Sequence, residues 1–511
     1  MNEQGEAIPL ASISNPRLKI TVASDKDGVF EVPAQLQQRL VFTSVGFEDK
    51  MVVVQSFDQQ ATISLISSAK SLDEVVVTSL GIKREKKALG YAIGEVKGEN
   101  IDKARDPNVI NTLAGRVPGL IISNTAGGPG SAAKVLIRGN TDITGTNQPL
   151  YVVDGVPMDN SNYGASSSDK YASGFDLGDA ISAIDPNDIE SISVLKGPAA
   201  SALYGGRAGH GVIMITTRKG AVRKSLGIEI NSTATIETLL TRASDNQYEY
   251  GQGMSGSIPT SQLVSRNTLF SNFGAKLDPN LSIPAFDGST APYGLVKNNI
   301  ENFFRTGSTF ANNISLTGGN ETTTFRFSYS NLYNNDIVPK SYINRNTFTL
   351  RGTSKIGTRL NIDVRATYMN EYVKNRPGLA DDPSNIGFNF VGLANNVDQK
   401  VFEKGYQDQF GNYVEWGGGQ YHLNPYWVIN RMSNITRKDR LMSIIQLNYN
   451  PTYWLSLQGR INNDFTFLGF QRFSPPYHPR RAYGPPGWYR YPVFVYISRC
   501  IDDLEEEVGA A

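Results

Sequence analysis

The sequence has little of what disulfides, metal centres and most acid–base sites require. Its 511 residues include one cysteine, Cys500, and three histidines, His210, His422 and His478. One cysteine cannot form an internal disulfide or a Cys-based zinc site. Neither a Walker-type phosphate loop nor a properly placed Gly-x-Gly-x-x-Gly motif is present, so we interpret the glycine clusters as turns. We therefore predict no metal and no cofactor.

An excess of charge of either sign is also lacking. The 49 lysines and arginines and the 48 aspartates and glutamates leave a formal net charge of +1. Nucleic-acid binders need cationic excess to neutralise phosphates, so a nucleic-acid partner is disfavoured. No run approaches the roughly 18 apolar residues of a membrane helix, which excludes a helical membrane protein. The first ten residues lack the regions of a secretory signal, so the protein either stays inside the cell or has a true amino terminus further upstream.

No persuasive active site is visible, and we predict that the chain is not an enzyme. The pairs Asp176 and Asp179, and Asp185 and Asp188, are close in sequence, but two-carboxylate hydrolysis needs a pair in space. His210 follows several glycines without a nearby acidic or thiol partner, so a turn histidine is the simpler interpretation.

Glycine, tyrosine and phenylalanine are plentiful, which indicates a mainly β chain. The first segment predicts a small β-domain that turns at Asp27-Gly28, with strands at 19–22, 28–32, 40–42, 51–54 and 61–66. Residues 72–78 form a β-branched run that suits addition to the edge of another protein's sheet, or an ordinary edge strand. The basic stretch 81–87 is interpreted as a solvated linker.

Residues 88–220 predict a compact mixed α/β domain. Asp106-Pro107 and Asp185-Pro186 each supply a helix cap followed by a proline suited to a first helical position. Strands are predicted at 133–139, 150–157, 191–197 and 212–217, and the second turns at Asp154-Gly155.

Strands with a period of two follow from about residue 226. In 360–368, Leu360, Ile362 and Val364 alternate with Asn361, Asp363 and Arg365, and the same pattern recurs around 325–330, 347–351 and 455–461. Strands of about 9–11 residues with this alternation suit a transmembrane β-barrel, and a soluble sandwich gives the same alternation. Beyond about Phe470 the alternation stops in a proline-rich stretch that a sheet interior does not tolerate.

Several segments together resemble the SusC/RagA family of TonB-dependent outer-membrane transporters. The resemblance rests on residues 72–78, 113–120, 137–139, 150–157, 189–205 and 211–217, in the order and spacing of the family's plug. The opening segment is similar, through 27–30 and 40–47, to the family's carboxypeptidase-regulatory-like domain.

The resemblance implies a fold and a division of the chain. The fold class is mainly β: a small β-sandwich, a mixed α/β plug and an incomplete antiparallel transmembrane barrel with about seven of roughly 22 strands. The implied domains are a regulatory-like β-sandwich at 1–70, a TonB box and linker at 71–87, a plug at 88–220, the first barrel strands at 221–470 and an anomalous tail at 471–511.

The resemblance also implies site residues in two groups. The TonB box that binds the partner is Asp73, Glu74, Val75, Val76, Val77 and Thr78. The plug motif comprises Arg116, Pro118, Gly119, Arg138, Gly139, Asp154, Gly155, Lys196, Gly197, Tyr204 and Gly205.

The implied function is active import of a large nutrient, an oligosaccharide, glycan or peptide, across the outer membrane. The implied partners are TonB with its inner-membrane energising proteins, a SusD-like surface lipoprotein, the substrate and outer-membrane lipid. TonB would pull on the box and move the plug. The alternative from another class is a soluble or surface all-β glycan-binding or adhesion protein without transport activity.

Some features depart from the family. About seven strands cannot close a barrel, and an open edge in lipid would leave backbone groups without partners. The tail does not resemble a barrel strand. In residues 207–211 the family usually has an asparagine close to the position of His210, and this sequence has none there. We therefore expect the chain to be a fragment of a transporter, without its signal peptide and with a shifted reading frame after about Leu468.

Overall fold

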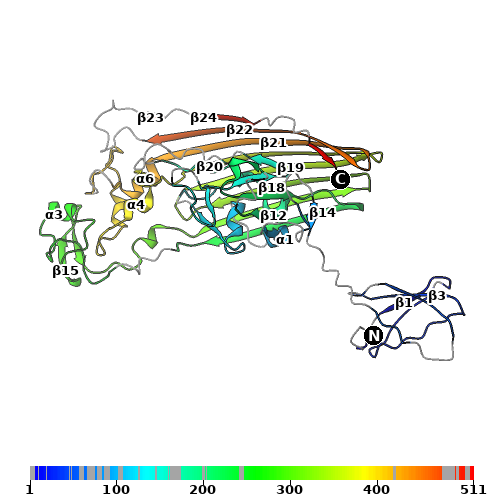
Figure 1. Cartoon of the computed structure of the whole chain (residues 1–511). Helices are drawn as coiled ribbons and strands as arrows, with labels where there is room; N and C mark the ends of the chain where they lie inside the picture. Colours follow the sequence, from blue (N-terminus) through cyan, green and yellow to red (C-terminus); the bar gives the residue numbers. More distant parts are fainter. Residues whose placement is uncertain are drawn as a thin grey trace. The chain divides into compact units, whose positions relative to one another are not determined.

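A computed structural model gives the structure of the chain (Figure 1). The chain divides into two compact units, Met1–Thr78 with Ile82–Gly90, and Ser79–Gly81 with Tyr91–Ala511. The residues that the structure describes are 6–9, 11–18, 20–44, 47, 49–56, 62–65, 75–77, 83–85, 93–101, 108–124, 127–143, 147–158, 160, 174–197, 202, 204–240, 247–417, 422–474, 489–490, 494–500 and 507–510.

The first unit contains a four-stranded antiparallel sheet. Its order is β2 (Ile20–Ala23), β1 (Ser12–Asn15), β3 (Arg39–Thr43) and β4 (Lys50–Val53). Three of these strands and the turn at Gly28, whose φ is 78°, agree with the sequence prediction. Residues 28–32 and the described part of 61–66 are not strands, so those two predictions were wrong.

The missed strand β1 carries the core of this unit. Ile13 is 1% exposed and packs with Leu40 and Phe42. Asn15 is completely buried because its amide group donates to Gln38 Oε1 at 2.8 Å and to Pro33 O at 3.0 Å. Asparagine is depleted in β-strands, so Asn15 did not indicate a strand at this position in the sequence.

The predicted plug region folds around a mixed five-stranded sheet. Its order is β11 (Val156–Met158), β10 (Leu150–Val153), β13 (Val212–Thr217), β12 (Ile189–Leu195) and β7 (Ile93–Lys97), and only β10 and β13 are parallel. A hairpin of β8 (Leu120–Asn124) and β9 (Ala133–Ile137) and the short helix α1 (Gly98–Ile101) complete its regular elements, together with 3-10 turns. The predicted strands are confirmed.

The two predicted helix caps had different outcomes. Asp185 accepts from Asn187 N at 2.7 Å and is followed by Pro186 in the 3-10 turn η5 (Pro186–Asp188), as predicted. Asp106 and Pro107 lie outside the described residues, and the cap of η3 (Val109–Leu113) is Asn108, whose side chain accepts from Ile110 N.

Seven long antiparallel strands form the wall that follows the plug. They are β14 (Arg223–Glu237), β17 (Gly307–Gly319), β18 (Thr323–Asn335), β19 (Tyr342–Ile356), β20 (Leu360–Lys374), β21 (Ser433–Thr452) and β22 (Leu455–Ser474), hydrogen-bonded in that order (Figure 1). We call these seven strands the wall. The count agrees with the sequence prediction of about seven strands.

The proline-rich stretch was predicted to be unsuited to a sheet interior, and the described strands of the tail pair only with the edge strand β22. β22 continues to Ser474, beyond the predicted end at Phe470. The short strands β23 (Tyr489–Arg490), β24 (Phe494–Cys500) and β25 (Glu507–Ala510) all pair with β22. Their pairing at the edge of the sheet avoids the prolines, which lie between them.

The two faces of the wall have the opposite exposure from those of a soluble sandwich. On β20 the apolar Val364 and Tyr368 are 41% and 42% exposed, whereas Arg365 and Thr367 are 6% and 1% exposed. A soluble sheet buries its apolar face because that removes hydrocarbon from water. The exposed apolar and buried polar faces are those of a partial β-barrel-like sheet around a plug.

The long connections of the wall build a compact module that the sequence did not reveal. Residues 238–306 contain α3 (Gln262–Asn267), β15 (Asp278–Pro284) and β16 (Thr290–Tyr293), and residues 375–432 contain α4 (Ile386–Phe390), α5 (Val401–Lys404) and α6 (Pro425–Arg431). Both connections leave the same end of the sheet (Figure 1). They share an aromatic core, in which Trp416 and Trp427 are each 1% exposed. We call the described residues of these two connections the loop module.

In the described part of the chain, every helix is too short or too polar to cross a membrane.

Candidate functional site

The predicted TonB box is described only at its centre. Val75–Val77 form β5, which pairs antiparallel with β6 (Lys83–Glu85), with Val76 opposite Arg84. Asp73, Glu74 and Thr78 lie outside the described residues. The basic stretch 81–87 was predicted to be a solvated linker, and its described centre is a short strand paired with β5. The extended backbone of β5 is the conformation that strand addition requires.

Five of the predicted plug-motif residues come together around Arg138. Its backbone N–H donates to Gly119 O at 2.8 Å, and Lys196 Nζ donates to the adjacent Pro118 O at 2.7 Å. A Cβ added to Gly197 would lie 3.0 Å from Arg138 Nη1, so the absence of a side chain at this position makes room for the guanidinium. These contacts tie the ends of β9 and β12 to the turn before β8.

The remaining motif residues lie in other parts of the plug. Gly139, next to Arg138, has a φ of +90°. Arg116 donates to Asn100 O. Tyr204 contacts Met214 Sδ, and Gly205 precedes the 3-10 turn η6 (Gly206–Ala208). These contacts lie within the plug.

Asp154 and Gly155, the last two motif residues, face the wall. Asp154 Oδ2 accepts from Arg365 Nη1 at 2.8 Å and from Arg351 Nη1 at 3.4 Å, on β20 and β19. Its two oxygens also accept from the Thr217 N–H at 3.0 Å and the Thr217 hydroxyl at 2.6 Å. Burial opposes ionisation, but the two arginines and Thr217 outweigh it and lower the pKa of Asp154. The plug turn thus presents a buried carboxylate anion to two wall cations.

A second plug carboxylate meets the wall at Asp188. Arg326 Nη2 lies 3.4 Å from Asp188 Oδ1, and the Ser328 hydroxyl donates to the same carboxylate at 2.7 Å. Burial and the nearby Asp188 raise the pKa of Asp185, which also caps η5. Asp185 thus caps η5 and also bonds to Ser330 of the wall, and Asp188 makes a second carboxylate contact with the wall.

The other carboxylate pair also has structural partners. Asp176 accepts from Ala132 N at 3.1 Å, and Asp179 accepts from Ser182 N at 3.0 Å. Burial raises the pKa of Asp179, against the opposing effect of Lys438. Both carboxylates bind backbone N–H groups of the plug, which accounts for their burial.

Wall cations also bind backbone carbonyls of the plug. Lys438 Nζ donates to Asp179 O at 2.7 Å, Arg351 Nη1 to Thr217 O at 2.9 Å and Arg460 Nη1 to Gly155 O at 2.8 Å. Arg440 and Arg326 donate in the same way to Ala180 O and Asn187 O. Lys438 and Arg440 are each 1% exposed. We call these contacts and the two carboxylate contacts the plug–wall interface.

The sequence did not identify the wall cations as site residues, although it contained a signal. Arg326, Arg351, Arg365 and Arg460 all fall on the polar face of the alternating strands. Charged side chains on one face of a sheet need a polar partner if that face is buried. The partner could not be identified because it lies more than a hundred residues away, as for Arg351 and Asp154.

Within the described ranges, no group of three or more histidine, cysteine, aspartate or glutamate residues could hold a metal ion. The interface is built from contacts of charged groups with one another and with carbonyls. Breaking it would leave cations and carboxylates without partners unless water enters.

Comparison with known proteins agrees with this architecture. Residues 85–212 match the family model of the TonB-dependent receptor plug domain, and residues 1–77 match the CarboxypepD_reg-like domain. TonB-dependent receptor P26 of Formosa agariphila is 24% identical over 94% of this chain and 44% of its own length. TonB-dependent receptor SusC of Bacteroides thetaiotaomicron is 26% identical over 87% of this chain and 40% of its own length.

Among solved structures, the RagAB peptide importer in its open-open state aligns with a TM-score of 0.57. The alignment covers 80% of this chain and 44% of that chain at 19% sequence identity, so it supports the fold. The present chain spans less than half the length of these relatives. The matches to the plug and CarboxypepD_reg-like domains, the similarity to SusC and the fold shared with RagAB support a SusC/RagA-type TonB-dependent receptor.

Proposed function

We propose that this chain supplies the gated half of a TonB-dependent importer in the outer membrane. The observation that carries the proposal is the plug–wall interface, in which buried cations of the wall hold carboxylates and carbonyls of the plug. Such an interface keeps the plug in place without covalent bonds. Its polar contacts can exchange for water when the plug moves, because every group in it also binds water well.

The path of the force follows from the order of the chain. β5 precedes the plug, and the first plug strand β7 pairs with β12, which ends beside Lys196. A pull on the TonB box would reach β7 first and then the plug sheet. TonB, energised by its inner-membrane partners, would supply the pull by adding a strand to β5.

The substrate class is a large nutrient, an oligosaccharide, glycan or peptide. Two similar proteins support it: SusC, a TonB-dependent receptor, and RagAB, described as a peptide importer. The same likeness supports a SusD-like surface lipoprotein as partner. The soluble or adhesive all-β alternative is disfavoured, because its sheet would expose the polar face that this wall buries.

Binding of the periplasmic carboxy-terminal domain of TonB to the purified chain tests the proposal. Val76→Pro removes a backbone N–H and should abolish binding, because strand addition depends on main-chain hydrogen bonds. Val76→Thr keeps the N–H and the β-branched shape, and serves as the matched control. Equal binding by the parent chain and the proline variant would refute the assignment of β5 as the TonB box.

A further inference from the structure

The connection from β20 to β21 contacts the plug through its first residues, which form the base of the loop module. Leu379 N donates to Gly174 O of the plug at 2.8 Å. A Cβ added to Gly128 of the plug would lie 2.9 Å from Pro377 Cδ, so that glycine admits the proline ring. The base of the loop module is therefore packed directly on plug backbone.

An ion pair fixes this base to the last long strand of the wall. Arg472, near the end of β22, donates from Nη1 and Nη2 to the two carboxylate oxygens of Asp382, each at 2.9 Å. Asp382 is 1% exposed and also accepts from Ser384 N at 2.8 Å. A two-point arginine–carboxylate pair fixes orientation as well as distance.

The same arginine contacts the plug. Its guanidinium carbon lies 5.1 Å from the centre of the Phe175 ring, within the range of a cation–π contact. Phe175 in turn packs on Phe470 of β22, with ring centres 5.0 Å apart. Leu177 and Leu468 complete this small buried cluster. Arg472 thus contacts the loop module through Asp382 and the plug through Phe175.

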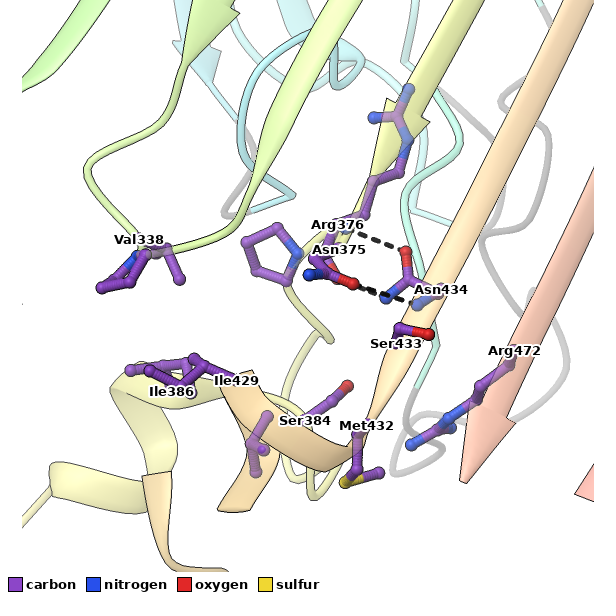
Figure 2. A pocket seen from close by; sticks show the side chains of 13 residues that line it. Val338, Asn375, Arg376, Ser384, Ile386, Ile429, Met432, Ser433, Asn434 and Arg472 are labelled. Carbon is purple, nitrogen blue, oxygen red and sulfur yellow. Dashed lines mark hydrogen bonds between the residues drawn. The ribbon is translucent and has the colours of Figure 1, made fainter. Parts of the chain in front are cut away.

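A small hollow lies beside these contacts (Figure 2). Its volume is about 30 Å³, room for one or two water molecules. Figure 2 shows Arg472, Met432 and Ser384 on one side of it and Val338 on the other. The hollow separates the strand ends at Asn375 and Asn434, which bond to each other, from α4 and α6 of the loop module. The contact between the strand ends and the module is therefore incompletely packed at this point.

We propose that Asp382, Arg472 and Phe175 form a clasp that couples the loop module to the plug segment 174–179, with Arg472 as the positioning residue. A shift of the module that moves Asp382 draws Arg472 away from Phe175 and frees the plug segment. In reverse, withdrawal of the plug removes the Phe175 ring from the Arg472 guanidinium and weakens the attachment of the loop module. The clasp deepens the proposed function by linking the surface where cargo would arrive to the gate.

Hydrogen–deuterium exchange on the purified, detergent-solubilised chain tests the clasp. Arg472→Met keeps the bulk of the side chain and removes the charge. We expect amide exchange to become about tenfold faster or more in two separate segments at once, plug residues 174–179 and loop residues 376–384, because removing one partner strands a buried carboxylate. Arg472→Lys retains an ion pair with Asp382 and should restore most of the protection in both segments.

Arg437→Met is the matched control. Arg437 also lies over an aromatic ring, Tyr372, at 5.8 Å, but it is exposed on the outer face of the wall. Its loss should leave both segments unchanged. Faster exchange in 376–384 alone, with 174–179 within about twofold of the parent, would overturn the coupling. If Arg472→Met does not fold, Asp382→Asn decides by the same readout, and unchanged protection of the plug segment in that variant would refute the clasp. The assay needs neither TonB nor cargo, so its failure is separate from failure of the proposed function.

Discussion

The contact between Asp154 and the wall gives a direct test of how the plug is held. Asp154→Asn keeps the size of the side chain and removes its charge. Arg351 retains the carboxylate of Asp363, which it binds at 2.7 Å, so its charge stays paired. Arg365 is 6% exposed, and in the described part of the chain Asp154 is its one ion-pair partner. The substitution therefore strands one buried cation.

The size of the effect follows from that stranded charge. Removing one partner of a buried ion pair costs about 3–5 kcal/mol. We expect the free energy of local opening at the β10–β11 turn to fall by that amount, which corresponds to amide exchange at least about a hundredfold faster. Asp154→Asn combined with Arg365→Met should recover much of the loss, because the double variant leaves no unpaired charge there.

Acid should reproduce the effect of the substitution. The pKa of Asp154 is lower in the folded chain than its ordinary value of 3.8. The contribution of its ionised form is therefore complete above the unfolded pKa and is lost as the pH falls through the lowered, folded pKa. Hydrogen exchange of the turn in Asp154→Asn, followed by mass spectrometry, measures the predicted change. An exchange rate within about twofold of the parent would show that these ion pairs do not hold the plug turn.

Three further substitutions test other parts of the structure. Gly155→Ala should destabilise the plug by about 1–2 kcal/mol in denaturant unfolding. The φ of Gly155 is +84°, and the new Cβ would lie 2.8 Å from Arg460 Nη1. Unchanged stability would contradict this turn geometry. Val364→Arg should weaken insertion into lipid vesicles by about 2–4 kcal/mol, whereas Val391→Arg in the loop module should not, and equal insertion would argue against a lipid-facing wall. Asn424→Ala should cost more than about 1 kcal/mol in unfolding because it removes both the cap of α6 and the buried side-chain donor to Phe402 O. Asn424→Asp keeps the capping acceptor but turns an oxygen toward that carbonyl, so it should not restore the stability, and parental stability of the Asp variant would contradict these contacts.

The regular parts of the fold could be predicted because each rests on local chemistry. The turn at Asp154-Gly155 needs two positive φ values, 49° and 84°, which an aspartate–glycine pair readily adopts. The alternation in 360–368 places the polar side chains on one face of the strand, regardless of what packs against that face. Which of the two faces is buried depends on the packing partner. The alternation alone therefore did not distinguish a barrel from a soluble sandwich, and only the resemblance to a family favoured the barrel.

The site was harder to predict because its two halves are far apart in the sequence. Arg365 and Asp154 are 211 residues apart, and no local pattern encodes their pairing. The loop module was missed for another reason: its elements are helices of four to seven residues and short strands, held by a shared aromatic core. Helices of this length depend on tertiary packing, so their sequences carry weak helical periodicity.

The way in which the wall cations bind carbonyls has a consequence for sequence divergence. Every residue other than the terminal one offers the same carbonyl oxygen, so replacing the side chain at Asp179, Ala180 or Thr217 leaves the acceptor for Lys438, Arg440 or Arg351 in position. At these positions the wall recognises the path of the plug backbone, whereas at Asp154 and Asp188 it also requires a carboxylate. Plugs that differ in sequence but keep this path and these two carboxylates could therefore be exchanged between walls, whereas each lost wall cation would have to be replaced by another.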